Sequence, residues 1–184
     1  MALDLGNLLQ KYLDAAAGNQ APAEAGNHFE QVAQQASPEV VGQGIADALR
    51  SDRTPPLGQM VSDIFAKADP QQRAGMLNQI LGSLGPGVLG SLGGALGGGA
   101  LGGGALGNIL GQIQGGARPQ VTPEQASQVS PSAVQDLANH AEKHDASIFD
   151  KLGNFYAQHP QLVKTLGSAA LTIALAKMAD RMRS

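Results

Sequence analysis

The middle of the chain constrains the fold more than any other part, because residues 93–107 are three consecutive copies of the pentapeptide GGALG. They lie in a tract, residues 82–117, in which 16 of 36 residues are glycine. Each glycine disfavours a helix by about 1 kcal/mol relative to alanine, so the tract cannot form an autonomous helix in water. Yet a leucine recurs every three to five residues, whereas flexible linkers are usually polar. Three alternatives stay open: closely packed helices, a linker, or a membrane-active segment.

On a helix, the glycines of this tract line up along two stripes with four-residue spacing. The leucines of the repeats are five residues apart and therefore point in different directions. Stripes of small residues let two helix backbones approach closely. We therefore expect the chain to associate with itself through the tract, and the candidate residues are Gly90, Gly94, Gly98, Gly102, Gly103, Gly107, Gly111, Leu96, Leu101 and Leu106.

Hydropathy argues against a membrane-spanning helix. Residues 74–117 carry no charge, but the most apolar 20-residue window, residues 88–107, holds ten glycines, which add little apolar surface. A second apolar stretch, residues 165–176, has 12 residues, fewer than the roughly 20 that a spanning helix needs. No basic residue precedes Lys11, whereas a secretory signal begins with a basic region. We expect a cytoplasmic protein; secretion without a cleavable signal peptide is the alternative.

Composition excludes several classes of protein. The chain has no cysteine, which excludes disulfides, thiolate metal sites and cysteine catalysis. Its formal net charge of −3 argues against a general nucleic-acid-binding protein, which normally carries a basic face. Four Phe and two Tyr are the only aromatic residues, so the core must be built from aliphatic side chains. A core this thin favours burial of apolar surface against a second copy of the chain.

Proline marks the expected starts of the helices. Five dipeptides place a capping side chain directly before a proline at the first helical position, where the missing N–H costs nothing: Ser37-Pro38, Thr54-Pro55, Asp69-Pro70, Thr122-Pro123 and Ser130-Pro131. Gln72 and Gln125 stand where a capping box requires them. His159-Pro160 is expected to open the last helix, with a less favourable cap.

The spacing of apolar residues agrees with these caps, and no stretch alternates with period two for long enough to form a strand. We therefore predict an all-α fold of several short amphipathic helices, flanking the glycine tract and ending in a long C-terminal helix from Pro160 to about Met182. Composition divides the chain into an acidic helical segment (1–81), the Gly/Leu-rich tract (82–117) and a second helical segment (118–184). The longest apolar stripe contains Leu162, Val163, Leu166, Ala170, Ile173, Ala174 and Met178, which indicates a core helix.

The two flanking segments echo each other. Val41 follows Pro38 by three residues, as Val134 follows Pro131. Phe65 precedes Pro70 by five residues, as Phe155 precedes Pro160, although the spacing between the two pairs differs by three residues. Two alternatives explain this pattern: an internal duplication, or a coincidence among proline-capped helices.

The candidate metal-binding and nucleotide-binding motifs in the sequence are incomplete. His140 and His144 have the i, i+4 spacing that allows two imidazoles to share a metal ion, but no third ligand is compelled; Asp136, Asp145 and His159 are the candidates. Residues 85–90 match the glycine pattern of dinucleotide-binding loops, yet no predicted strand precedes them. We expect no enzyme activity, no metal and no cofactor.

The Leu/Gly blocks LGSLGPGVLGSLGGALGGG and the following TPEQASQV…VQDLA segment resemble the YidB-like family of small bacterial proteins over about residues 76–141. This resemblance implies a bacterial, helical, non-enzymatic protein. Residues 145–184, with FYAQHPQLVKTL, depart from the family pattern. The composition is also similar to that of the harpins, secreted glycine-rich proteins of plant-associated bacteria that act at membranes and self-associate.

The sequence thus predicts a non-catalytic structural or interaction protein that forms a homo-oligomer or a larger assembly through its glycine-rich tract. No nucleic-acid partner is expected. A secreted or membrane-active, harpin-like protein is the alternative function.

Overall fold

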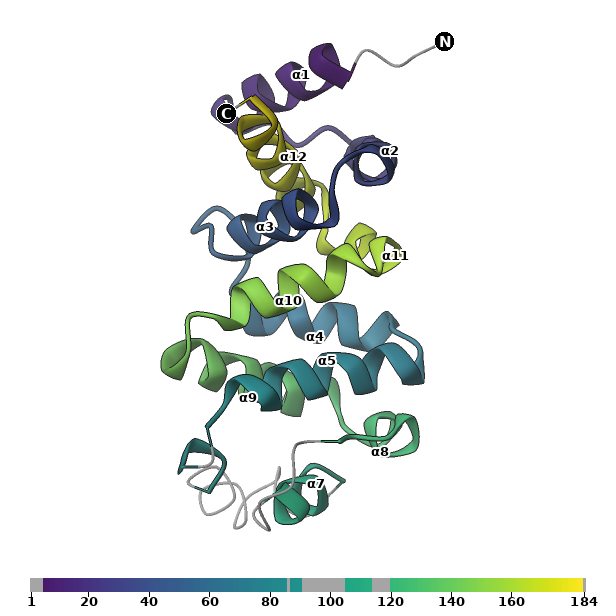
Figure 1. Cartoon of the computed structure of the whole chain (residues 1–184), viewed down its shortest axis with the longest axis vertical. Helices are drawn as coiled ribbons and strands as arrows, with labels where there is room; N and C mark the ends of the chain where they lie inside the picture. The colour runs from purple at the N-terminus through teal and green to yellow at the C-terminus, as the bar shows by residue number, and fades with distance from the viewer. Residues whose placement is uncertain (1–4, 86, 91–104, 114–119, 184) are drawn as a thin grey trace. The chain divides into compact units, whose positions relative to one another are not determined.

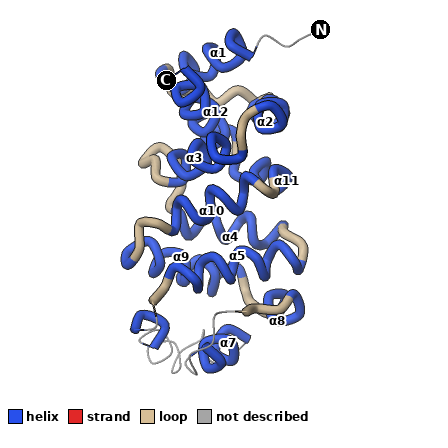
Figure 2. Tube along the Cα trace, viewed as in Figure 1, coloured by secondary structure: helices blue, strands red, loops and turns tan. Residues whose placement is uncertain are grey.

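The computed structural model describes residues 5–85, 87–90, 105–113 and 120–183. Within these ranges the secondary structure is helical and contains no strand (Figures 1 and 2). The all-α prediction is therefore confirmed. The chain forms two compact units, which we describe separately: unit 1 comprises Met1–Pro56 and Phe149–Ser184, and unit 2 comprises Leu57–Ile148.

Unit 1 is built around the C-terminal helix α12 (Ser168–Arg183), which packs against α1 (Leu5–Ala17), α2 (Ala25–Gln35) and α3 (Pro38–Leu49), as Figure 1 shows. It also contains α10 (Ile148–Ala157) from Phe149 onward, and the short helix α11 (Pro160–Val163). Its largest fully buried side chains include Tyr12, Phe29 and Tyr156. The core of unit 1 therefore draws on both ends of the sequence.

Unit 2 is built on two helix pairs. α4 (Leu57–Lys67) packs on α9 (Pro131–His144), and α5 (Pro70–Ser83) packs on α8 (Pro123–Ser127). α5 also contacts α9, and α7 (Ala105–Ile113) contacts α8. The core is mainly aliphatic, with Phe65 as its buried aromatic residue among the described residues. The two units cut across the three segments that composition separates, because the helix pairs join residues from both sides of the glycine tract.

The structure confirms four of the five predicted proline caps. The side chains of Ser37, Asp69, Thr122 and Ser130 each accept a hydrogen bond from the first turn of the helix that follows, and Asp69 and Thr122 form complete capping boxes. The prediction for Thr54-Pro55 is wrong. The Thr54 hydroxyl donates to the carbonyl oxygens of Ala48 and Ser51, and α4 begins only at Leu57. Thr54 therefore closes the turn after α3 and does not cap α4.

The C-terminal helix starts later than the sequence predicts. α11 gives way to a 3₁₀ turn, Lys164–Leu166, and α12 begins at Ser168. Between them Gly167 has φ = 86°, a conformation that glycine adopts without a steric penalty and that interrupts the helix. The apolar stripe is nevertheless buried on both sides of this break, so its assignment to the core is confirmed.

Candidate self-association surface

The described part of the glycine-rich tract includes α7, whose sequence is ALGNILGQI. Ile109 and Leu110 are buried, whereas Gly111 and Gln112 are exposed. The helix therefore buries the side chains of Ile109 and Leu110 and presents Gly111 and Gln112 on the opposite side. This arrangement explains how a glycine-rich segment forms a helix here: burial of its aliphatic face offsets the low helix propensity of its glycines.

A hollow of about 460 Å³ lies beside this face, between α7 and α8. It is lined by Gly107, Asn108, Gly111, Gln112, Gln125 and Gln128; we call this set the amide surface. A side chain at Gly111 would meet no atom within 4 Å. The Gln125 side chain is held in place, because its Oε1 accepts a hydrogen bond from the Thr122 N–H at 3.0 Å.

The chemistry of the amide surface is that of hydrogen bonding. Its four side chains are carboxamides, each with an acceptor oxygen and a donor NH₂ group. None of the described residues that line the hollow is ionisable, so these residues supply neither a general base nor a charged anchor for a ligand. Such a surface can pair with backbone or amide groups of another helix.

The structure brings together only part of the predicted self-association set. Gly107 and Gly111 lie on the amide surface, and Gly90, at the end of the helical turn 87–90, is exposed with open space where a Cβ would stand. Leu106 belongs to α7. The remaining candidates lie outside the described residues: Gly94, Gly98, Gly102, Gly103, Leu96 and Leu101.

Sequence reasoning missed the four amides. Asn108 and Gln112 follow Gly107 and Gly111 directly, so they repeat the same four-residue spacing one position later. This four-residue spacing is the sequence pattern from which Asn108 and Gln112 could have been predicted. Gln125 of α8 and Gln128, which directly follows that helix, come after residues 114–119 in the chain, and no local pattern in the sequence pairs them with α7.

The two histidines on α9 stack on each other, with ring centroids 4.6 Å apart. Nε2 of His140 is buried without a hydrogen-bond partner, and its burial, followed by the nearby His144 and Lys143, lowers the pKa of His140. Within the described ranges, no three His, Cys, Asp or Glu side chains cluster closely enough to hold a metal ion. His140 is half-buried and His144 is exposed on this helix.

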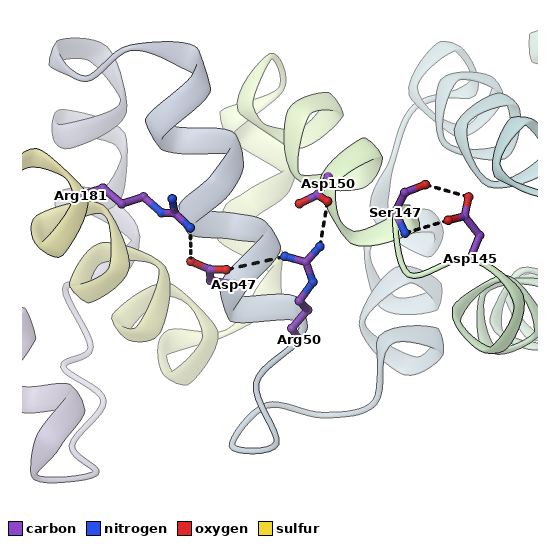
Figure 3. Close-up of polar contacts among 6 residues, drawn as sticks. All are labelled: Asp47, Arg50, Asp145, Ser147, Asp150 and Arg181. Carbon is purple, nitrogen blue, oxygen red and sulfur yellow. Dashed lines mark hydrogen bonds and ion pairs between the residues drawn. The ribbon is translucent and has the colours of Figure 1, made fainter. Parts of the chain in front are cut away.

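A network of charged side chains links three helices of unit 1 (Figure 3). Asp47 on α3 lies between Arg181 of α12, at 2.8 Å, and Arg50, at 3.7 Å. Arg50 also contacts Asp150 of α10 at 2.8 Å and lies over the ring of Phe149. Each charge in this network has an opposite partner, which favours a structural role in joining α3 to α10 and α12.

None of the helices in the described part of the chain combines the length and hydropathy needed to cross a bilayer. No protein-family model, curated protein or solved structure significantly matches this chain.

Proposed function

We propose that this chain is a non-catalytic protein that associates with copies of itself through its glycine-rich tract, with the amide surface as a principal contact. One observation carries the proposal: the outward face of α7 at Gly111 is open, with no atom within 4 Å of a Cβ position. A neighbouring helix can therefore approach the backbone of α7 closely. The resemblance to YidB-like proteins supports a bacterial, non-enzymatic protein of this kind.

The chemistry of the amide surface favours a second copy as the partner. A two-fold contact brings a surface against itself, so the surface must be self-complementary. Carboxamides satisfy this condition because each one both donates and accepts hydrogen bonds. A lining with net charge would repel its own copy, and the described lining residues are uncharged.

Two substitutions on the surface test the proposal. Replacing Gly107 and Gly111 with Val puts branched side chains where the partner backbone would lie. The molar mass, measured by light scattering after size-exclusion chromatography, should fall toward the 18.7 kDa of a single chain. The matched control is Gly82→Val on α5, which adds the same side chain at another exposed, open glycine and should leave the mass unchanged.

An unchanged mass for the Gly107→Val, Gly111→Val variant would overturn the amide surface as the contact. Circular dichroism of the same samples separates loss of association from loss of folding. The harpin-like alternative predicts a different result: binding to vesicles of anionic phospholipid that the two substitutions weaken, with no change in mass in the absence of lipid.

A further inference from the structure

Two helices on opposite sides of the glycine-rich tract begin in the same way. α3 starts at Ser37-Pro38 and α9 at Ser130-Pro131, 93 positions later. In each, the serine Oγ accepts a hydrogen bond from the backbone N–H three residues on, at 3.4 Å from Val40 N and 3.3 Å from Ala133 N. The two helices therefore share both their sequence start and their capping geometry.

The same shift of 93 positions superposes their buried faces. The pairs 41/134, 44/137, 45/138 and 48/141 are buried in both helices. The helices that follow, α4 and α10, match at a shift of 91 positions, where the pairs 57/148, 61/152 and 65/156 are all buried. Each of these is followed in turn by a helix that opens with proline, at Pro70 and at Pro160. The similarity thus extends over three consecutive helices, but the buried Phe65 is matched by the buried Tyr156 and not, as the sequence echo suggests, by the half-buried Phe155.

The contacts made by α3 and α9 supply evidence that does not depend on the sequence echo. In unit 1, Gly153 of α10 packs against α3, where an added Cβ would meet Gly42 O and lie 3.1 Å from Ala46 N. In unit 2, Gly58 of α4 packs against α9, where an added Cβ would lie 2.7 Å from Gln135 O and would also meet the Asn139 side chain. At the shift of 93 positions, Gly42 corresponds to Gln135 and Ala46 corresponds to Asn139. Both helices therefore receive a glycine of a crossing helix at equivalent positions of their own, although Gly58 and Gly153 are 95 positions apart and do not correspond at the shift of 91.

The partners of α3 and α9 are exchanged. α3 lies before the tract and packs with α10 and α12, which lie after it. α9 lies after the tract and packs with α4 and α5, which lie before it. The preceding helices follow the same rule, since α2 packs on α12 and α8 packs on α5. Figure 1 shows the exchange in unit 1, where the dark blue α3 lies beside the yellow α12.

From these observations we infer that the chain contains two equivalent helical motifs, residues 37–83 and 130–183, that exchange helices so that each motif completes the unit begun by the other. The partner of each half of the chain is accordingly the other half of the same chain. This inference does not rest on the proposed function of the amide surface.

Cleavage between the motifs tests the exchange in the full-length protein. Residues 98–103 are replaced by a site for a specific protease, and the folded protein is cut there. The two fragments should elute together as a 1:1 complex and keep the helical circular dichroism of the uncut protein, because both units join residues from the two fragments. Fragments that separate under native conditions would overturn the inference.

A second measurement tests the equivalence of the motifs in the uncut chain. Hydrogen exchange is followed in Gly153→Ala and in Gly58→Ala. Gly153→Ala should speed exchange in α3 and leave α9 unchanged, whereas Gly58→Ala should speed exchange in α9 and leave α3 unchanged. Gly82→Ala, at an open position of α5, is the control. If Gly58→Ala loosens α3 in place of α9, the two motifs are not exchanged.

Discussion

Gly58 of α4 lies directly against the side chain of Asn139 on α9, although the two residues are 81 positions apart in the chain. A Cβ at Gly58 would also approach the Gln135 carbonyl oxygen to 2.7 Å, closer than carbon and oxygen atoms can pack without movement of the backbone. The glycine at this position is therefore required by the approach of two helices and not by a turn.

Gly58→Ala should accordingly destabilise the protein, against the general preference of helices for alanine. Steric overlap of this kind costs about 1–3 kcal/mol. Gly82→Ala is the matched control, because Gly82 is exposed on α5 with nothing within 4 Å of its Cβ position. It should stabilise the protein by up to about 1 kcal/mol. Urea denaturation measures both; a Gly58→Ala protein as stable as the control would contradict the close crossing.

The hydroxyl of Tyr156 is buried without a hydrogen-bond partner. A buried donor that has lost its hydrogen bonds to water lowers the stability of the folded state. Tyr156→Phe removes this group and keeps the ring, so we expect an increase of about 1 kcal/mol in the free energy of unfolding at neutral pH. Tyr12→Phe is the comparison, because it deletes a hydroxyl that lies 2.7 Å from Nδ1 of His28 and should lower stability. A loss of stability in Tyr156→Phe would mean that this hydroxyl has a partner.

The same tyrosine predicts how stability changes at high pH. Burial raises the pKa of Tyr156 above its ordinary value, which is about 10. A raised folded-state pKa gives stability that is complete below the unfolded pKa and is lost as the pH rises above it. Stability should therefore fall above about pH 10, and it should fall less steeply in Tyr156→Phe. Equal slopes in urea titrations at pH 9, 10 and 11 would contradict this expectation.

The sequence predicts local structure well where one residue determines it. The caps at Ser37, Asp69, Thr122 and Ser130 follow from a side-chain acceptor beside a proline, and the structure confirms them. Thr54 fails because its hydroxyl has an alternative: the end of α3 offers it carbonyl acceptors. Residue preferences alone cannot decide whether a threonine caps the next helix or stabilises the preceding turn, because its hydroxyl can form hydrogen bonds in either place.

Local sequence patterns do not predict which helices pack against each other. Gly42, Gly58 and Gly153 mark the close crossings, but nothing in their own segments distinguishes them from the exposed Gly82. The residues of the amide surface likewise include some that the sequence predicts and some that it does not. Gly107 and Gly111 follow from four-residue spacing, whereas Gln125 and Gln128 join the surface only because α8 packs beside α7.

Stability at mildly acidic pH should depend on His140. Its pKa is lowered in the folded state, first by burial and then by His144 and Lys143. A depressed folded-state pKa gives stability that is present above the unfolded pKa, about 6.5, and is lost as the pH falls. His140→Gln should therefore show a smaller loss of stability between pH 7.5 and pH 5.5 than the unchanged protein. The control is His159→Gln in unit 1; the prediction fails if both variants lose stability as the unchanged protein does.

The ion pair between Asp47 and Arg181 should contribute a small, salt-dependent part of the stability of unit 1. The atoms are 2.8 Å apart, but the Arg181 side chain is 40% exposed, so solvent weakens the interaction. Exposed pairs contribute about 0.2–1 kcal/mol, and added salt screens them. A double-mutant cycle with Asp47→Ala and Arg181→Ala measures the coupling, and Lys177→Ala, an exposed cation on the same helix, replaces Arg181→Ala in the control cycle. We expect coupling for Arg181 at 50 mM salt, a smaller value at 1 M salt, and little coupling for Lys177. Equal coupling for both cations would show that Asp47 acts through the general charge of α12 and not through the contact with Arg181.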